Sequence, residues 1–397
     1  MDLTTLIAGA FVLIAALGID TALHPRDIIL QVTRAQSLGN ISVTDSMLSD
    51  VLQSEVDNVY VTPSIVAAPV VRLKTDRGIG VSIIEAIGLS RVAEALQNQL
   101  EHYPDTIILH VYSENGVIKV LVTGYNSRRG TDFDQEVDQV KDELIVSLIR
   151  RAADTAMIQI DPYMTALSSM RKHIGDKDFK YSEDVIQFAK SRLPRSGTSV
   201  DRSLFENLEG MIALFSDHDD RAGKLFQNAM NSNPTNHVAT VNLALMEIEA
   251  KNPERAVSLL LNIVVNPQQK NPIVISAAYL TLAVAYLDLH RPTEADAAIQ
   301  QAALYNPANA TIASVWAEVK HTLGDENGAL ALRAKARSLE GENGAYSEIA
   351  ALYYTLAWEN GEVVLRDPFE TVAAAPDVSR KTAPTAPETA VKAVNPG

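Results

Sequence analysis

The spacing of apolar residues changes along the chain, from a mixture of alternating and helical periods to an almost purely helical one. Both periods occur in residues 26–133, which predicts a compact α+β domain. Thr44 precedes DSMLSDVLQSEV, a helical pattern whose first free amides can donate to the threonine oxygen. The stretch therefore predicts a capped amphipathic helix that buries Met47, Leu48, Val51 and Leu52.

A β-hairpin is predicted for TIILHVYSENGVIKVLVTG. Two β-branched runs are joined there by Asn115 and Gly116, a pair that tolerates the positive φ angles of a type I′ turn. The alternation predicts one face of the sheet with Ile107, Leu109 and Val111, and the other with Ile108, His110 and Tyr112.

The helical period dominates after the hairpin. Residues 134–161 are predicted to form one long connecting helix, acidic at its start, where the helix dipole favours negative charge. Residues 162–358 show no convincing alternating segment and are predicted to be helical repeats. Residues 359–397 end in DVSRKTAPTAPETAVKAVNPG, which is rich in Pro, Ala and Thr, and are predicted to form a disordered tail.

The N-terminus, residues 1–25, is predicted to be a transmembrane anchor. Leu3 to Ile19 is a run of seventeen residues without a charge, at the lower limit for a spanning helix. The charged residue before the run is Asp2, so the basic region of a cleaved signal peptide is missing. Arg26 and Arg34 after the run predict a cytoplasmic soluble part at a bacterial inner membrane. A cleaved export signal with a periplasmic soluble part, or a buried helix of a soluble protein, are the alternatives.

Two stretches of the helical region share one spacing of small and apolar residues. In RPTEADAAIQQAALYNP, Ala295 is followed 4, 7 and 12 residues later by Ile299, Ala302 and Pro307. SDHDDRAGKLFQNAMNSNP repeats these offsets, and a small residue lies twelve positions before each first alanine, where two helix axes could approach closely. The second set is Ala222, Phe226, Ala229 and Pro234, and the two small residues are Gly210 and Ala283.

Two weaker copies begin at Ala256 and Ala329, so that the four copies lie 34, 39 and 34 residues apart. This pattern resembles the tetratricopeptide repeat (TPR), a 34-residue helix-turn-helix unit, from Ser203 to about Glu342. The resemblance implies an all-α solenoid of stacked hairpins with the alanines at packing positions. The family's tryptophan in the first helix is missing, and an irregular helical bundle is the alternative. The α+β domain is more faintly similar to the N-terminal domain of TolB.

Composition and motifs disfavour catalysis. Asp and Glu exceed Lys and Arg by 49 to 34, and the net charge of −15 repels nucleic acid. Gly78 and Gly80 begin a dinucleotide fingerprint, but Ile83 replaces its third glycine. The acidic run at 217–220 lacks the later residues of a calcium loop, and the chain has no cysteine. The chain is therefore predicted to be no enzyme and to use no metal and no cofactor.

The predicted binding site is the concave face of the repeats, which the first helix of each pair lines. An apolar face with a few polar additions suits an amphipathic helix or an extended peptide of a protein partner. Alternatively, the chain's own segment VVLRDPF fills this face. The predicted partner-binding residues are Leu204, Asn207, Met211, Val238, Val241, Leu245, Leu280, Val284, Leu287, Ser314 and Glu318.

Together these features predict a membrane-anchored scaffold or adaptor that binds a protein partner. Anchoring raises the local concentration of that partner, so that modest affinity is enough. One alternative is a structural subunit of a membrane-associated assembly that forms homo-oligomers through the α+β domain. The other is a ligand sensor that uses the α+β domain as its pocket.

Overall fold

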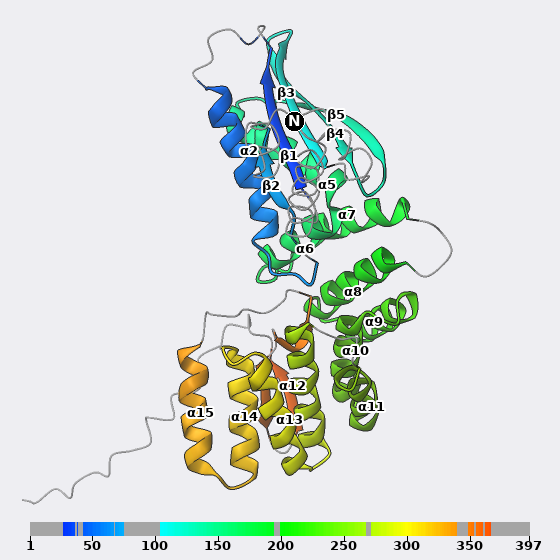
Figure 1. The fold of residues 1–397 in the computed structure, drawn as a ribbon, viewed down its shortest axis with the longest axis vertical. Coiled ribbons are helices and arrows are strands. Elements are labelled where there is room, and N and C mark those ends of the chain that lie inside the picture. The colour runs from blue at the N-terminus through cyan, green and yellow to red at the C-terminus, as the bar shows by residue number, and fades with distance from the viewer. Residues whose placement is uncertain are drawn as a thin grey trace, which may run out of the picture.

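The computed structural model has a mixed sheet with its helices at one end of the molecule and a stack of helical hairpins at the other (Figure 1). The predicted anchor segment and the glycines at 78 and 80 lie outside the described residues. Among the residues that are described, no helix is both long enough and apolar enough to cross a membrane. The structure describes residues 27–35, 38, 43–66, 68–74, 104–193, 199–266, 271–339, 348–352, 355–359 and 362–366.

The sheet has five strands in the order β2-β1-β3-β4-β5. β1 lies parallel to β2 and β3, whereas β3, β4 and β5 pair antiparallel. With the helices described below, this confirms the predicted α+β domain. The strands are Asp27–Arg34 (β1), Val70–Leu73 (β2), Asp105–Glu114 (β3), Val117–Asn126 (β4) and Thr131–Asp138 (β5).

The predicted hairpin is β3 and β4. Asn115 and Gly116 both have positive φ, 53° and 79°, as a type I′ turn requires. Burial alternates along β3, because Ile107, Leu109 and Val111 are fully buried and the residues between them are half-exposed. One face of the sheet therefore carries the core of the domain.

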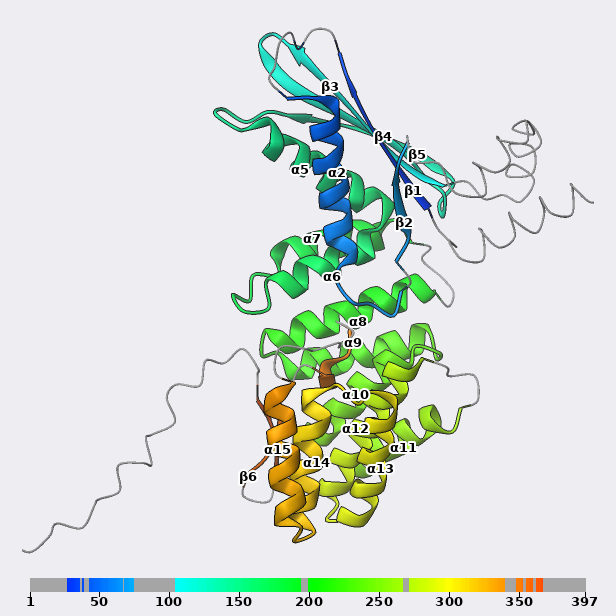
Figure 2. The same cartoon turned by 60° about the vertical axis from the view of Figure 1, so that its left-hand side comes forward.

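Two helices pack together beside this sheet, α2 (Asp45–Tyr60) and α5 (Ile145–Ile160) (Figure 2). The backbone amide of Met47 donates to Thr44 Oγ1 at 3.2 Å, which confirms the predicted cap. Leu48 and Leu52 are fully buried, but the prediction for Met47 is wrong, because this side chain is 51% exposed. Met47 precedes Leu48 by one residue, about 100° around the helix, and so lies outside the buried stripe.

The connecting helix predicted for residues 134–161 begins only at Ile145, as α5. Thr131–Asp138 instead forms β5 at the edge of the sheet. Phe133 and Val137 are four residues apart, a spacing that fits both a helix and one face of a strand. The strand places the Phe133 ring over Gly124 of β4. A Cβ at Gly124 would lie 2.4 Å from Cζ of Phe133, so this packing needs the glycine. Asp134 and Glu136 lie on the other face of the strand, and Gln135 shares the face of Phe133 and Val137.

Helices α6 (Pro162–Lys172) and α7 (Lys180–Ser191) lead from the sheet domain to the repeats, which form four hairpins of a TPR-like solenoid. Within each hairpin the two helices pack against each other. The first helices are α8 (Val200–Phe215), α10 (His237–Glu249), α12 (Pro272–Asp288) and α14 (Ala310–Thr322), and the second helices are α9 (Asp219–Ser232), α11 (Pro253–Val264), α13 (Pro292–Tyr305) and α15 (Glu326–Ser338).

Every hairpin turn contains one left-handed residue that ends the first helix. Asp217, Lys251, His290 and Gly324 have φ of 59°, 61°, 55° and 81°. The next amide bonds back across the turn, for example from Arg291 N to the carbonyl oxygen of Tyr286 at 2.8 Å, in a Schellman-type cap. These four positions lie 34, 39 and 34 residues apart, like the repeat alanines. The left-handed turn residues therefore recur with the same spacing as the alanines at the packing positions.

The small residues of the repeat are buried between the paired helices. A Cβ at Gly210 would lie 2.5 Å from Phe226 Cε1, so glycine is what allows α8 to pack against this ring of α9. Ala283 and Ile299 are fully buried at the corresponding positions of α12 and α13, and Ala222 and Ala295 are fully buried as well. The predicted packing role of these residues is confirmed.

The C-terminal part of the repeat region differs from the prediction. Ala350–Leu352 forms a short 3-10 helix, η2, and Thr355–Glu359 forms strand β6, where a helix was predicted up to residue 358. Glu362–Arg366 forms strand β7, although it falls in the predicted disordered tail. β6 and β7 pair antiparallel with Glu359 opposite Glu362. The two intervening residues are Asn and Gly, the same pair that joins β3 and β4, and this turn signal competes with the helical one.

Candidate functional site at the groove face of the repeats

The first helices of the repeats face the C-terminal segment of the chain. η2 contacts α10 and α12, β7 contacts the same two helices, and β6 contacts α14 (Figure 1). We call the surface that α8, α10, α12 and α14 present to residues 348–366 the groove face. Of the segment VVLRDPF, the alternative occupant of this face, the first four residues belong to β7, which contacts α10 and α12, and the last three lie outside the described residues.

Two asparagines of the groove face hold the main chain at the start of this segment. Asn242 Nδ2 donates to the carbonyl oxygen of Glu348 at 2.8 Å, and Asn242 Oδ1 accepts from the amide of Ala350 at 2.8 Å. Asn207 Nδ2 donates to the same Glu348 oxygen at 3.3 Å, and the two asparagines bond to each other at 2.9 Å. Both are buried, at 1% and 0% exposure, so these bonds form out of water. The groove face thus binds a polypeptide through its backbone donor and acceptor.

The side chain of Glu348 leaves the groove face and enters the sheet domain. Its Oε1 accepts hydrogen bonds from Ser64 Oγ, from Ile65 N at 3.2 Å and from Tyr163 OH at 3.1 Å. Ser64 and Ile65 follow α2, and Tyr163 lies at the start of α6. We call these three donors the junction pocket. One residue of the C-terminal segment therefore connects the sheet domain, α6 and the repeats.

Burial gives Glu348 an unusual titration. The side chain is fully buried, and this desolvation raises its pKa to about 7, although the hydrogen bonds from Ser64, Tyr163 and Ile65 act in the opposite direction. Its Oε2 is buried and has no hydrogen-bond partner among the described residues. The carboxyl group thus has one oxygen with three donors and another with none.

The elements around the junction pocket are themselves tied together. Tyr163 lies edge-to-face against Phe205 of α8, with ring centroids 5.8 Å apart. Burial also raises the pKa of Tyr163 well above its ordinary value, so its hydroxyl keeps the proton that it donates. Tyr60 OH donates to Asp161 Oδ2 at 3.2 Å, which joins the end of α2 to the cap of α6. These contacts fix the positions of the pocket donors.

Among the predicted partner-binding residues, Asn207 contacts the bound segment directly, and Met211 contacts Asn242, with its Sδ 3.6 Å from Asn242 Nδ2. The partner-binding role of the whole set stays a prediction. Glu318 accepts from Arg333 of its own hairpin at 3.1 Å, and Leu204 and Ser314 are half-buried. The others are buried: Val238, Val241, Leu245, Leu280, Val284 and Leu287.

Four residues of the site were missed by sequence reasoning: Ser64, Tyr163, Asn242 and Glu348. The available signals were single polar residues inside apolar runs, Asn242 in ATVNLALM and Glu348 before IAAL. A buried polar residue needs a partner, so such an exception marks a position with a specific contact. The sequence does not say which distant residue supplies it.

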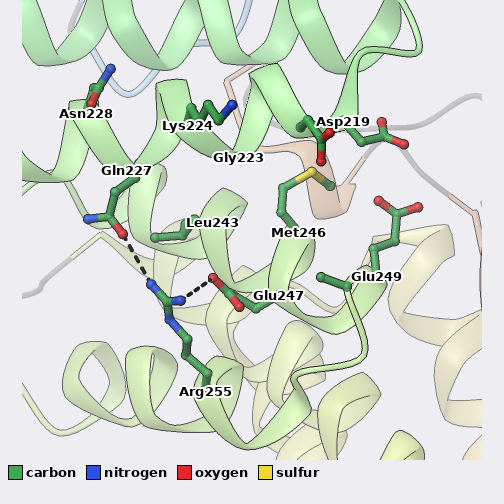
Figure 3. Close-up of a pocket in the computed structure, with 12 residues that line it drawn as sticks. Asp219, Gly223, Lys224, Gln227, Asn228, Leu243, Met246, Glu247, Glu249 and Arg255 are labelled. Carbon is green, nitrogen blue, oxygen red and sulfur yellow. Dashed lines mark hydrogen bonds and ion pairs between the residues drawn. The ribbon is translucent and has the colours of Figure 1, made fainter.

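A second hollow lies on another side of the stack, between α9, α10 and α11, with a volume of about 580 Å³ (Figure 3). Arg255 spans its floor, with contacts to Glu247 at 3.1 Å and Gln227 at 3.4 Å. Burial and the charge of Asp219 raise the pKa of Glu249 to about 7. Most of the residues that line this pocket are polar or charged, and Leu243 and Met246 add apolar surface.

The acidic run at 217–220 lies at the turn between α8 and α9. Asp217 Oδ2 accepts from Lys177 Nζ at 2.7 Å, and Asp219 and Asp220 lie in the first turn of α9, where the helix dipole favours carboxylates. Across the described residues, no group of three or more His, Cys, Asp or Glu side chains is arranged to hold a metal ion.

No protein-family model matches the chain, and no curated protein matches it. A solved structure described as MamA AMB-1 covers 46% of this chain and 99% of its own length, with 18% identity and a TM-score of 0.33. One described as a crystal structure of MamA covers 44% and 95%, with 15% identity and a TM-score of 0.32. A MamA RS-1 double mutant covers 46% and 97%, with 14% identity and a TM-score of 0.34. Likeness at this level carries no conclusion about what this chain binds.

Proposed function

We propose that this chain is a scaffold that binds a peptide segment of a protein partner along the groove face of its repeats. The observation that supports the proposal is the pair of asparagines, Asn207 and Asn242, which hold a backbone oxygen and a backbone amide of the chain's own C-terminal segment. Main-chain hydrogen bonds of this kind do not depend on side-chain identity, and neighbouring apolar contacts add affinity. The proposed function is therefore binding without catalysis.

The groove face offers such a segment a dry and apolar environment. Ile349, Ala350, Ala351 and Leu352 of the chain's own segment are at most 1% exposed. Burial of this much apolar surface is the main source of affinity, whereas the asparagine bonds fix register and direction. A partner segment with small and apolar side chains would make the same contacts in place of the chain's own residues.

The proposal includes attachment to a membrane through residues 1–25. The uncharged run from Leu3 to Ile19 supports an anchor, and Arg26 and Arg34 support a cytoplasmic soluble part at a bacterial inner membrane. An anchored scaffold meets its partner at high local concentration. Membrane fractionation tests this part: the chain stays with membranes in high salt, and deletion of residues 1–25 releases it. Release of the full chain by salt alone would contradict the anchor.

Site-specific photo-crosslinking in cells tests the binding surface. Leu204 of α8 and Ser314 of α14 are half-buried positions that the repeat pattern predicts to face the groove, and Leu304 on α13 is a matched control because it is 73% exposed on a second helix. A photoreactive residue at position 204 or 314 should capture the same protein partner, and one at 304 should not. Capture at 304 alone would place binding on the outer helices and overturn the proposal.

A further inference from the structure

The junction pocket is a built binding site for one side-chain oxygen. A hydroxyl of Ser64, the amide of Ile65 and the hydroxyl of Tyr163 converge on Glu348 Oε1. Tyr163 is 6% exposed, so the pocket is closed to water on that side. None of the three donors carries a charge. The pocket therefore recognises an oxygen at the end of a side chain of this length, whether that oxygen belongs to a carboxyl or to an amide.

We propose that the junction pocket is the specificity pocket of the groove face, and that it takes the side-chain oxygen of a glutamate or glutamine from the partner's segment in place of Glu348. This inference rests on the proposed function. The partner segment would carry that residue first and small apolar residues next, as in the chain's own Glu348-Ile349-Ala350-Ala351-Leu352.

The geometry of Glu348 supports its displacement from the junction pocket by a partner residue, rather than a permanent internal contact. Its Oε2 is buried without a hydrogen-bond partner in the described part of the chain, and no cationic side chain is among the partners described for it. A buried carboxyl with an unsatisfied oxygen costs free energy, which weakens the internal contact. The tether gives the internal segment a high effective concentration, and a weaker contact is what lets a partner compete against it.

Replacement would have a consequence outside the repeats. Glu348 is the residue through which the C-terminal segment reaches Ser64 and Ile65, which follow α2. A partner that supplies its own glutamate or glutamine restores these bonds, whereas a partner without one leaves three donors unpaired. The pocket therefore distinguishes partner segments by a penalty for the wrong residue as well as by attraction to the right one.

Peptide binding to the full chain with Glu348→Ala tests the proposal. This substitution removes the internal side chain and leaves the three donors of the pocket in place. Labelled peptides of residues 346–352, YSEIAAL, with Glu, Gln or Ala at the third position are compared by fluorescence anisotropy. The Glu and Gln peptides should bind at least about tenfold more tightly than the Ala peptide. Adding Tyr163→Phe to the same chain should reduce this difference.

Two results would overturn the proposal. Equal affinity of the three peptides would show that the groove binds main chain without reading this side chain, and the proposed function would survive. No binding of any peptide would show that residues 348–352 are a fixed internal tie. If Glu348→Ala lowers the helical content, Glu348→Gln is used as the host, with amide exchange of residues 348–352 as the readout. Exchange in this host should rise with the Glu peptide more than with the Ala peptide, and an equal rise would overturn the proposal.

Discussion

The side-chain amide of Asn242 donates to the main-chain oxygen of Glu348 at 2.8 Å, so a helix of the second repeat hairpin holds a residue 106 positions later in the chain. The same asparagine accepts from the amide of Ala350. One side chain thus pairs with a buried donor, the amide of Ala350, and with a buried acceptor, the Glu348 oxygen, which it shares with Asn207. The contact makes the C-terminal segment part of the folded repeat stack.

Gly210→Ala should destabilise the chain. The new Cβ would lie 2.5 Å from Phe226 Cε1, and the ring has no room to move because it is fully buried. Overpacking of this kind costs about 1–3 kcal/mol, more than the gain of about 1 kcal/mol in helix propensity. Chemical denaturation measures the change in the free energy of unfolding.

Gly223→Ala in α9 is the matched control for this change. Its nearest contact would be Met246 Cβ at 3.9 Å, an ordinary van der Waals distance. This substitution should stabilise the chain by about 0.5–1 kcal/mol through helix propensity. Equal effects of the two substitutions would show that α8 and α9 do not approach as described.

His290→Gly should stabilise the third repeat hairpin. His290 has a φ of 55°, a left-handed conformation that costs a residue with a Cβ about 1 kcal/mol or more. Glycine removes this cost but loses more entropy on folding, so the net gain is up to about 1 kcal/mol. Thermal unfolding measures it. Gly324→Ala, at φ 81° in the fourth hairpin, should lower the unfolding temperature, because alanine has a Cβ. A gain in stability from this substitution would contradict the turn assignment.

The stability of the chain should fall as pH rises from about 4.5 to about 7, through Glu348. Its pKa is about 7 in the folded chain and near the ordinary 4.5 when unfolded. In this window the folded state keeps the proton that the unfolded state has lost, so the stabilisation is complete below 4.5 and lost above 7. The expected change is about 3 kcal/mol over the window. The neighbouring Tyr163 stays protonated, because its pKa is raised well above its ordinary value.

Glu348→Gln isolates this effect. The amide keeps an oxygen for the three pocket donors and does not titrate, so the variant should lack this component of the pH dependence. Because the pKa of Glu249 is also raised to about 7, the comparison uses the difference between the chain and the variant at each pH. The unfolding temperatures of the unmodified chain and of Glu348→Gln are measured from pH 4 to pH 8. If the two sets change in parallel, Glu348 is not buried as described.

The repeats could be predicted from the sequence because they depend on short spacings. Ala295, Ile299 and Ala302 are buried at 0% exposure, as their offsets predict, and the hairpin at Asn115 follows from one dipeptide. The strand β5 was missed because Phe133 and Val137 fit both periods. β6 was missed because its residues were assigned to the helical region, and β7 because it was assigned to the tail, although the Asn-Gly pair between them is a turn signal.

The junction pocket could not be predicted in the same way. Ser64 and Glu348 are 284 residues apart, and Asn242 and Glu348 are 106 apart. No local period connects such positions, because each contact depends on how the sheet domain, α6 and the repeats are placed together. The sequence marks Asn242 and Glu348 only as polar exceptions in apolar surroundings, and the fold determines their partners.

Amide hydrogen exchange at Ala350 is the most direct test of the account, because this amide donates to Asn242 Oδ1 at 2.8 Å on the groove face. The account predicts strong protection in the unmodified chain and exchange at least about tenfold faster in Asn242→Ala, since one hydrogen bond to the segment is worth about 1 kcal/mol and the variant loses two. Asn228→Ala, at an exposed position of α9, should leave the rate unchanged. An Ala350 amide that exchanges in the unmodified chain as fast as a solvent-exposed one would contradict the claim that the groove face holds a polypeptide backbone.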